Sequence, residues 1–438
     1  MRLESDGSSQ KKLVTTAACF MGLSHLLYLK EYLKGALFAL VELLFLCFAP
    51  FAIKKIVNMV TLGEPRPDLP VKLRPNSMFM LIDGILVLAI VAIFVAVYVI
   101  SVRSAKRSYK EYCVTKRLAS SRTTVDSVLN GAFPLAGLAP CVLMLLIFVV
   151  VPLVFSICVA FTNYSAPGHI PPNNTVDWVG GQNFKELMTG GNSWSKGFVR
   201  IAVWTLVWAV LSTFTCYFGG LLVAVQLKES GIKCASIFRF IFILPYAVPS
   251  VITMLVWRNL LNGTFGTVNR TLQALGLLHG TIPWLGNATY AQVMCIVINL
   301  WAGFGYFMML SMGTMTAIPA DLFEAAKIDG ASDRQILQHI TLPLVLYQTM
   351  PLIIMSFTHN INNFGIIYFL TGGDPAVSDS TTTMAGGTDI LVTWIYKLTM
   401  TLQKYNYASV IAVLIFAVLA PFAVYQFMNT KAYKEGEV

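Results

Sequence analysis

The chain has 438 residues, of which 56% are hydrophobic and only 12% are charged, and its formal net charge is +10. Its mean hydropathy of +0.69 is far above that of soluble domains, which excludes a soluble class and predicts an integral membrane protein. The basic residues lie largely in short segments beside apolar runs, so the positive-inside rule explains them better than nucleic-acid binding does. The eight cysteines show no CxxC spacing, which argues against a disulfide framework and against a metal site.

The first 54 residues divide into a tail, an interfacial segment and one span. Residues 1–12 are polar and lack a signal-peptide cleavage site, so we expect a cytoplasmic tail. Residues 13–33 are only moderately apolar and are interrupted by charged side chains, which suits the membrane interface better than a crossing. The first span is predicted at 35–54 and contains Glu42. A carboxylate at that depth should face other helices, and a structural role is favoured over a functional one.

The remaining apolar runs predict seven further spans, at 79–102, 134–161, 201–227, 237–260, 289–316, 344–371 and 405–428. The densest basic stretch follows the second span and consists of Arg103, Lys106, Arg107, Lys110, Lys116, Arg117 and Arg122. The positive-inside rule therefore places that loop in the cytoplasm, and counting spans places both termini there too. The connection 54–78 must then lie outside, although it holds five basic residues, which is a local violation of the rule.

The fifth span contains two prolines, Pro245 and Pro249. Prolines free backbone carbonyls and bend a helix, an arrangement that membranes tolerate where neighbouring helices or a water-filled path satisfy those carbonyls. We therefore expect a kinked helix that lines a pathway.

Between the sixth and seventh spans lies a polar segment, 318–343, that predicts two short helices outside the hydrocarbon. Asp321, with a glutamate three residues on, predicts the N-cap of the first helix, and Gly330 its terminator. Ser332 starts a second capping box, and Pro343 marks the beginning of the next span. The first helix also offers small and apolar side chains that a solvated loop would not need, namely those of Leu322, Phe323, Ala325, Ala326 and Ile328. This composition predicts a docking element.

Motifs for enzymatic or ion-coupled chemistry are missing from the sequence. There is no Gly-Lys dipeptide and hence no P-loop, and neither HExxH nor a G-x-S-x-G elbow occurs. A membrane-embedded enzyme is therefore poorly supported. An ion-coupled secondary transporter, the alternative from a different class, would place ionisable residues in mid-span, where the later spans hold few or none.

The later spans carry neutral polar groups instead. Ser356, Asn360 and Asn363 recur at intervals of four and three, which places them on one face of a helix. Amides donate and accept together, so such a stripe beside an aromatic ring suits a sugar. The sixth span supplies Gly303 for close approach and Tyr306 for stacking. The same residue types also serve as ordinary helix–helix contacts, and from these residues alone the two interpretations are equally supported.

The polar segment 318–343 resembles the EAA coupling motif of membrane subunits of bacterial ABC importers. The resemblance rests on Glu324-Ala325-Ala326, on Asp329-Gly330-Ala331, and on Ile340 to Pro343. In that family the loop seats in a cleft of the ATPase subunit and transmits its closure. The resemblance thus implies ATPase coupling through Glu324, Ala325, Ala326, Asp329 and Gly330, with ATP and Mg²⁺ bound by the partner ATPase and no cofactor in this chain.

From about residue 200 onward, the chain resembles the larger membrane subunit of maltose and maltodextrin ABC importers. The similar stretches are WAGFGY, SFTHNINNF, LTGGDP and TTTMAGGTDILVTWIYK. The resemblance implies an all-α type I importer fold, with sugar contacts at Gly303, Tyr306, Ser356, Asn360 and Asn363. Residues 162–200 are too short for the large periplasmic domain that enterobacterial members carry at this position. In this respect the chain resembles the Gram-positive members of the family.

The expected organisation has three parts. Residues 1–34 form the tail and interfacial helix, 35–133 accessory spans and the basic loop, and 134–438 the permease core with the coupling loop 318–343. The resemblance implies a multi-pass protein of the bacterial cell membrane that imports an oligosaccharide, maltodextrin first, with galacto-oligosaccharides or another oligosaccharide as the alternative. Its implied partners are a second permease subunit, an ATPase dimer and an extracellular sugar-binding protein.

Overall fold

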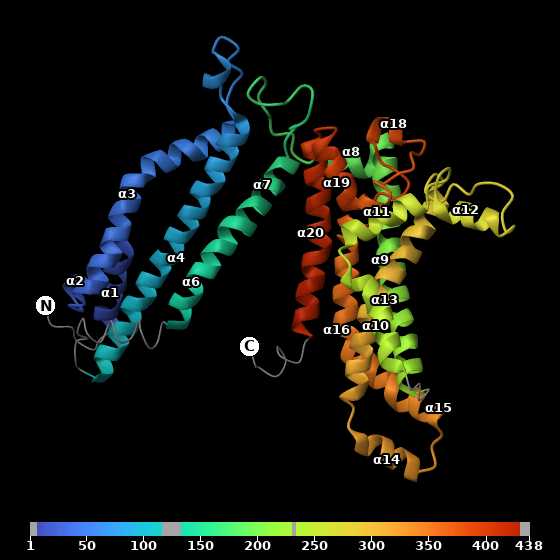
Figure 1. Cartoon of the computed structure of the whole chain (residues 1–438). Helices are drawn as coiled ribbons and strands as arrows, with labels where there is room; N and C mark the ends of the chain where they lie inside the picture. Colours follow the sequence, from blue (N-terminus) through green and yellow to red (C-terminus); the bar gives the residue numbers. More distant parts are fainter. Residues whose placement is uncertain (1–6, 116–132, 230–233, 430–438) are drawn as a thin grey trace. The chain divides into compact units, whose positions relative to one another are not determined.

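The computed structural model describes residues 7–115, 133–229 and 234–429 and divides the chain into two compact units, Met1–Val179 and Gly180–Val438 (Figure 1). Over these ranges the elements are helices, accompanied by two isolated β-bridges. Among the described residues, seven helices are long and apolar enough to cross a membrane, or eight if the one bent pair is counted as a span, in agreement with the eight predicted spans. The tail residues 1–6, the basic residues Lys116, Arg117 and Arg122, and the C-terminal residues 430–438 lie outside the described ranges.

The first unit contains helices α1 (Gly7–Cys19), α2 (Leu23–Leu27), α3 (Tyr32–Thr61), the 3₁₀ turn η1 (Val71–Leu73), α4 (Ser77–Thr115), α6 (Phe133–Leu145), the π-turn η2 (Leu146–Val150) and α7 (Val151–Ala160). α1, with 13 residues, is about 20 Å long and α2 is shorter still, so neither can cross a hydrocarbon layer of about 30 Å. This agrees with the prediction that 13–33 do not span. α1 packs on α4 and α2 packs on α3, and Leu13, Ala17 and Leu29 form one buried cluster with Ala105 and Tyr109.

Glu42 has a structural partner inside this unit. Its carboxylate accepts a hydrogen bond from the backbone N–H of Met21, at the turn between α1 and α2. The turn passes through Gly22, whose φ is +81°, and a Cβ there would lie 2.2 Å from the carbonyl oxygen of Gly35. Glu42 therefore satisfies a backbone N–H where the turn at Gly22 lies close to α3, which agrees with the structural role expected for this carboxylate.

The second unit contains α8 (Gln182–Thr189), α9 (Ser193–Glu229), α10 (Ala235–Ala247), α11 (Ser250–Leu260), α12 (Thr267–Ala274), α13 (Ala288–Thr316), α14 (Ala320–Ile328), α15 (Asp333–Ile336), the π-turn η3 (Leu337–Thr341), α16 (Leu342–Ile361), α17 (Phe364–Leu370), α18 (Ser380–Thr383), α19 (Leu391–Met400) and α20 (Tyr405–Met428). α9 and α13 form its centre, where Tyr217, Phe307 and Met308 are buried. A Cβ on Gly220 would lie 2.5 Å from the carbonyl oxygen of Phe304, so glycine allows the two backbones to approach closely.

Two predicted spans are interrupted. The fifth is not one kinked helix: α10 and α11 meet at 90°, because Val248 is extended and Pro249 precedes a new helix. The seventh begins earlier than predicted, since α15 runs through the π-turn into α16 as one helix, Asp333–Ile361, and then breaks at Asn362 before α17. Pro343 lies inside this continuous helix, directly after the π-turn Leu337–Thr341, so it does not mark the beginning of the span as predicted.

The helix caps of the coupling loop are largely as predicted. Gly330 ends the first helix with φ +80°. Ser332 donates its backbone N–H to Gln335 Oε1 at 2.9 Å in the predicted capping box. The prediction that Asp321 is the N-cap is wrong: Pro319 holds that position, and Asp321 lies in the first turn, where its charge favours the helix dipole.

The segment between α17 and α19 is braced by two ion pairs. Arg200 on α9 donates to Asp379 Oδ1 at 2.8 Å and to the Gly386 carbonyl at 2.7 Å. Lys397 Nζ lies 2.7 Å from Asp389 Oδ2, and the Asp389 side chain is fully buried. Burial raises the pKa of the Asp389 carboxyl, and the Lys397 ammonium opposes that rise.

Candidate functional site: a membrane cavity and a coupling loop

A cavity of about 700 Å³ lies within the second unit, where α9, α13, α16 and the break between α10 and α11 meet. All five residues predicted to contact sugar line it, namely Gly303, Tyr306, Ser356, Asn360 and Asn363. The break contributes Pro245 to Ser250 to the same wall. Pro245 and Pro249, which were predicted to line a pathway, therefore lie in the wall of this cavity.

Asn360 is the most constrained of these side chains. It is buried, its Nδ2 donates to Thr213 Oγ1 at 3.0 Å, and its backbone carbonyl accepts from Trp208 Nε1 at 3.0 Å. Asn363 Nδ2 donates to Asn360 Oδ1 at 3.3 Å. The prediction of one continuous helical face is wrong, because α16 ends at Ile361. Asn363 reaches the cavity as the residue that begins α17, and the amides still meet.

Gly303 serves the wall and the packing together. A Cβ at this position would lie 2.9 Å from Cys216 Sγ on α9. Cys216 donates from Sγ to the carbonyl oxygen of Asn299 and accepts from the Asn299 side-chain amide, each at 3.3 Å. A larger residue would push α9 and α13 apart, so the packing interpretation of this glycine holds, and its contact with sugar stays a prediction.

Aromatic rings form the other part of the wall. The ring of Tyr306 lies 5.4 Å from that of Tyr246, which precedes the α10–α11 break, and 5.2 Å from that of Phe307. Tyr306 is 38% exposed, so its face remains available to the cavity.

The chemistry of the cavity follows from its lining. The residues that line the cavity carry asparagine amides, two serine hydroxyls and one threonine hydroxyl, two tyrosines and the imidazole of His359, and they include no aspartate, glutamate, lysine or arginine. Amides and hydroxyls both donate and accept hydrogen bonds, and aromatic faces cover apolar C–H surface. The arrangement suits a neutral polyhydroxyl ligand.

Three residues on α9 that hydrogen-bond to asparagines of the cavity were not predicted, namely Trp208, Thr213 and Cys216. The hydrogen bond between Thr213 and Asn360 joins positions 147 residues apart. Nothing local in the α9 sequence indicates this partner, whereas the neighbouring amides were found by their spacing.

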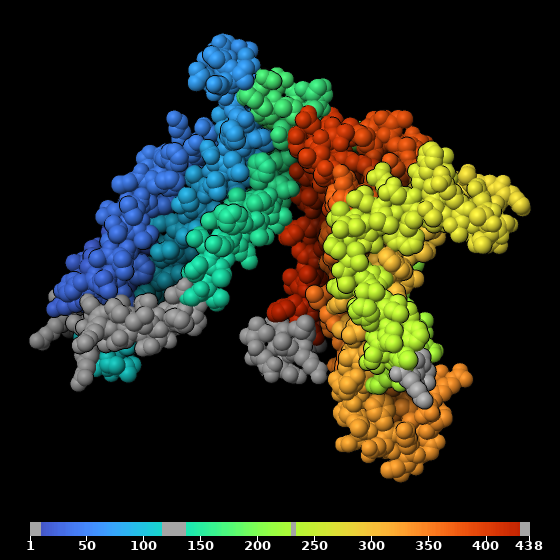
Figure 2. Space-filling model, in the orientation of Figure 1, coloured from blue at the N-terminus to red at the C-terminus, as the bar shows by residue number. Residues whose placement is uncertain are grey.

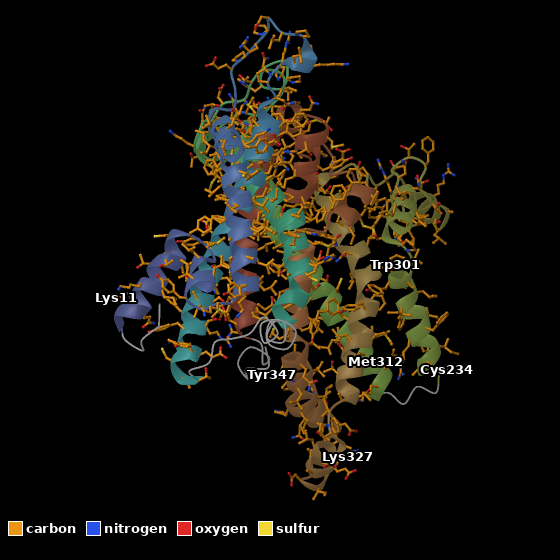
Figure 3. All side chains as sticks on the ribbon, turned by 90° about the vertical axis from the view of Figure 1, so that its left-hand side faces the viewer. Lys11, Cys234, Trp301, Met312, Lys327 and Tyr347 are labelled. Carbon is orange, nitrogen blue, oxygen red and sulfur yellow. The ribbon has the colours of Figure 1, made fainter. Side chains whose placement is uncertain are left out.

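The coupling loop lies at one end of the second unit, opposite α12 and α18 (Figure 1). Figure 3 shows Lys327 near its tip, with Met312 and then Trp301 successively farther along α13. Glu324, Ala325 and Ala326 lie on α14, of which no residue is buried. Asp329 and Gly330 form the turn that follows. Leu322 and Ile328 are exposed, at 44% and 86%, so apolar contact surface is presented as predicted.

α14 is attached to the body of the unit by one aromatic side chain. Phe323 packs against the buried cluster between α9 and α13, and Lys228 Nζ lies 6.0 Å from the centre of its ring. Lys228 also donates to the carbonyl oxygen of Met315 at 2.7 Å, which satisfies an acceptor at the end of α13. The loop is therefore fixed at its base and exposed at its tip.

Comparisons with known proteins agree with this geometry. Residues 216–430 match the family model described as the binding-protein-dependent transport system inner membrane component. The chain is 37% identical over 413 residues to the galactooligosaccharides transport system permease protein of Bacillus subtilis, covering 93% of this chain and 95% of that one. It is 34% identical over 420 residues to the maltodextrin transport system permease protein of the same organism, covering 92% of each.

A solved bacterial ABC transporter that imports the acidic polysaccharide alginate shares the fold. Its TM-score is 0.52 at 22% identity, over 70% of this chain and all of that one. The cavity, the coupling loop and these similarities converge: the chain belongs to the family of inner-membrane permease components of binding-protein-dependent ABC importers.

Proposed function

We propose that this chain is a pathway subunit of an ATP-driven importer of neutral oligosaccharides, with maltodextrin as the first candidate. The observation that carries this proposal is the 700 Å³ cavity, whose lining offers amides, hydroxyls and aromatic faces and includes no aspartate, glutamate, lysine or arginine. An acidic polysaccharide would need compensating charges there. The two relatives named for galactooligosaccharides and maltodextrin transport support this substrate class. Because the chain belongs to the permease family of ABC importers, the alternative hypothesis of an ion-coupled secondary transporter is not favoured.

The proposed mechanism connects the coupling loop to the cavity through one helix. A pair of partner ATPase subunits, which hold ATP and Mg²⁺, grips α14 and moves it on closure. The helix Asp333–Ile361 has 29 residues, about 43 Å, and carries Ser356 and Asn360 near its far end. A displacement at Asp333, which follows the turn at Gly330, therefore reaches the cavity wall along one continuous helix. A second permease subunit completes the pathway, and the motion alternates access between the two sides.

The proposed orientation in the bacterial cell membrane places the coupling loop and both termini in the cytoplasm. The support for this orientation is the basic C-terminal part of α4 and the number of spans between it and the coupling loop. A sugar-binding protein on the outer side delivers the oligosaccharide to the cavity.

The test is ATPase activity of the chain co-purified in lipid with its second permease subunit, ATPase and binding protein. We expect maltotriose to stimulate hydrolysis only when the binding protein is present. If a galacto-oligosaccharide stimulates hydrolysis and maltotriose does not, the substrate would be assigned as a galacto-oligosaccharide. The 37% identical relative supports this second candidate. Assembly with no response to any neutral oligosaccharide would refute the proposed substrate class.

A further inference from the structure

The connection between α3 and α4 projects beyond the ends of both helices, at the end of the first unit opposite α1 and α2 (Figures 1 and 3). In Figure 2 its side chains form a separate knob, the blue atoms at the top of the view. We call residues 62–76 the knob. Because the knob extends along the helix axes, the bilayer that surrounds α3 and α4 cannot cover its tip.

The knob has a defined conformation. It contains four prolines, Pro65, Pro67, Pro70 and Pro75. Arg74 Nε donates to the Leu69 carbonyl at 2.9 Å, and its Nη2 donates to the Pro67 carbonyl at 3.2 Å. These bonds close the tip on itself, so little chain entropy is lost when a partner binds it.

The base of the knob is braced against the segment that follows α7. Ser77 Oγ donates to the Leu62 carbonyl at 2.7 Å and accepts from the backbone N–H of Val176 at 3.1 Å. The indole of Trp178 donates to the carbonyl oxygen of Val60 at 3.0 Å. Two segments about 100 residues apart thus form one rigid support.

The rigid tip presents apolar side chains to solvent. Val71 is 53% exposed and Leu73 is 69% exposed, and the exposed Lys72 stands between them on the same 3₁₀ turn. A rigid projection that ends in aliphatic side chains and lies clear of lipid is typical of a protein-docking element.

The charge of this region indicates the character of the partner. The knob holds three basic residues, Arg66, Lys72 and Arg74, against the two acidic residues Glu64 and Asp68. Arg66 pairs with Asp68 at 3.2 Å and Arg74 donates to backbone carbonyls of the knob, whereas Lys72 is exposed at the tip. Lys72 at the tip favours an acidic partner surface.

We infer that the knob docks the extracellular sugar-binding protein, with Val71 and Leu73 in an apolar depression of that protein and Lys72 facing acidic residues at its rim. This inference rests on the proposed function, since a binding-protein-dependent importer must receive its binding protein on this side. It also assigns a function to the first unit, which precedes the residues that match the family model.

The experiment uses the full importer in lipid nanodiscs and titrates maltotriose-loaded binding protein while ATPase activity is recorded. Leu73→Asp and Lys72→Glu should each raise the half-maximal binding-protein concentration, the former about tenfold or more, with basal ATPase and the plateau unchanged. Lys11→Glu on α1 is the matched charge reversal at the opposite end of the unit and should leave the curve unchanged.

A photo-crosslinker attached at Leu73→Cys gives a second readout that does not depend on affinity, and we expect it to label the binding protein. Superimposable titration curves for wild type and both tip variants, or labelling of lipid alone, would overturn the docking role while the importer remained established. A wild-type importer that no loaded binding protein stimulates would instead refute the proposed function and the inference with it.

Discussion

The turn at Gly330 offers the sharpest test of the coupling mechanism. Its φ of +80° lies in the left-handed region, and a Cβ built there would meet nothing within 4 Å. A substitution therefore acts through backbone strain and not through a clash. A non-glycine residue in this region costs about 1–2 kcal/mol, and valine more than asparagine, because asparagine tolerates it. A penalty of that size lowers the population of the native turn by a factor of roughly 5 to 30.

We therefore expect Gly330→Val to reduce maltodextrin transport per ATP hydrolysed several-fold, and Gly330→Asn to remain close to wild type. The assay is parallel measurement of sugar uptake and ATP hydrolysis in proteoliposomes that contain the whole importer. Equal assembly of both variants with the ATPase is the control, since the turn is exposed. Wild-type coupling in the valine variant would show that the conformation of this turn does not transmit the motion.

Three further predictions concern buried polar groups. Lys397→Met should cost about 3–5 kcal/mol, because it leaves the buried Asp389 carboxylate unpaired, and thermal unfolding of the purified subunit measures the loss. Asn360→Leu should lower both transport and thermal stability, whereas Ser356→Ala should lower transport alone, because only Asn360 holds α9 by a hydrogen bond. Burial lowers the pKa of His25 below 6.5, so near and below that pH the unfolded chain binds a proton that the folded chain does not. The free energy of unfolding should therefore fall as the pH falls below about 6.5. His25→Gln should remove this part of the pH dependence of the unfolding midpoint.

Local sequence determined the spans and most helix caps of the coupling loop. An apolar run in lipid must satisfy its own backbone groups, so its hydropathy alone predicts a helix, as at Ala288–Thr316 and Tyr405–Met428. The caps at Gly330 and Ser332 depend on neighbours three or four residues away, which is why they were predicted correctly. The five cavity residues were found from helical spacing and from the family resemblance, and all five line one cavity.

Tertiary structure decided how these helices break and what they touch. Prolines in the fifth span predicted a bend, but not its size, which is 90° between α10 and α11. The break at Asn362 lies where α16 and α17 meet other helices, and no proline or glycine signals it. The bond from Asn360 to Thr213 joins residues far apart in the chain. Packing between helices decides such partners. Apolar surface alone does not distinguish one neighbouring span from another, so small residues and polar groups fix which helices pair and in which register.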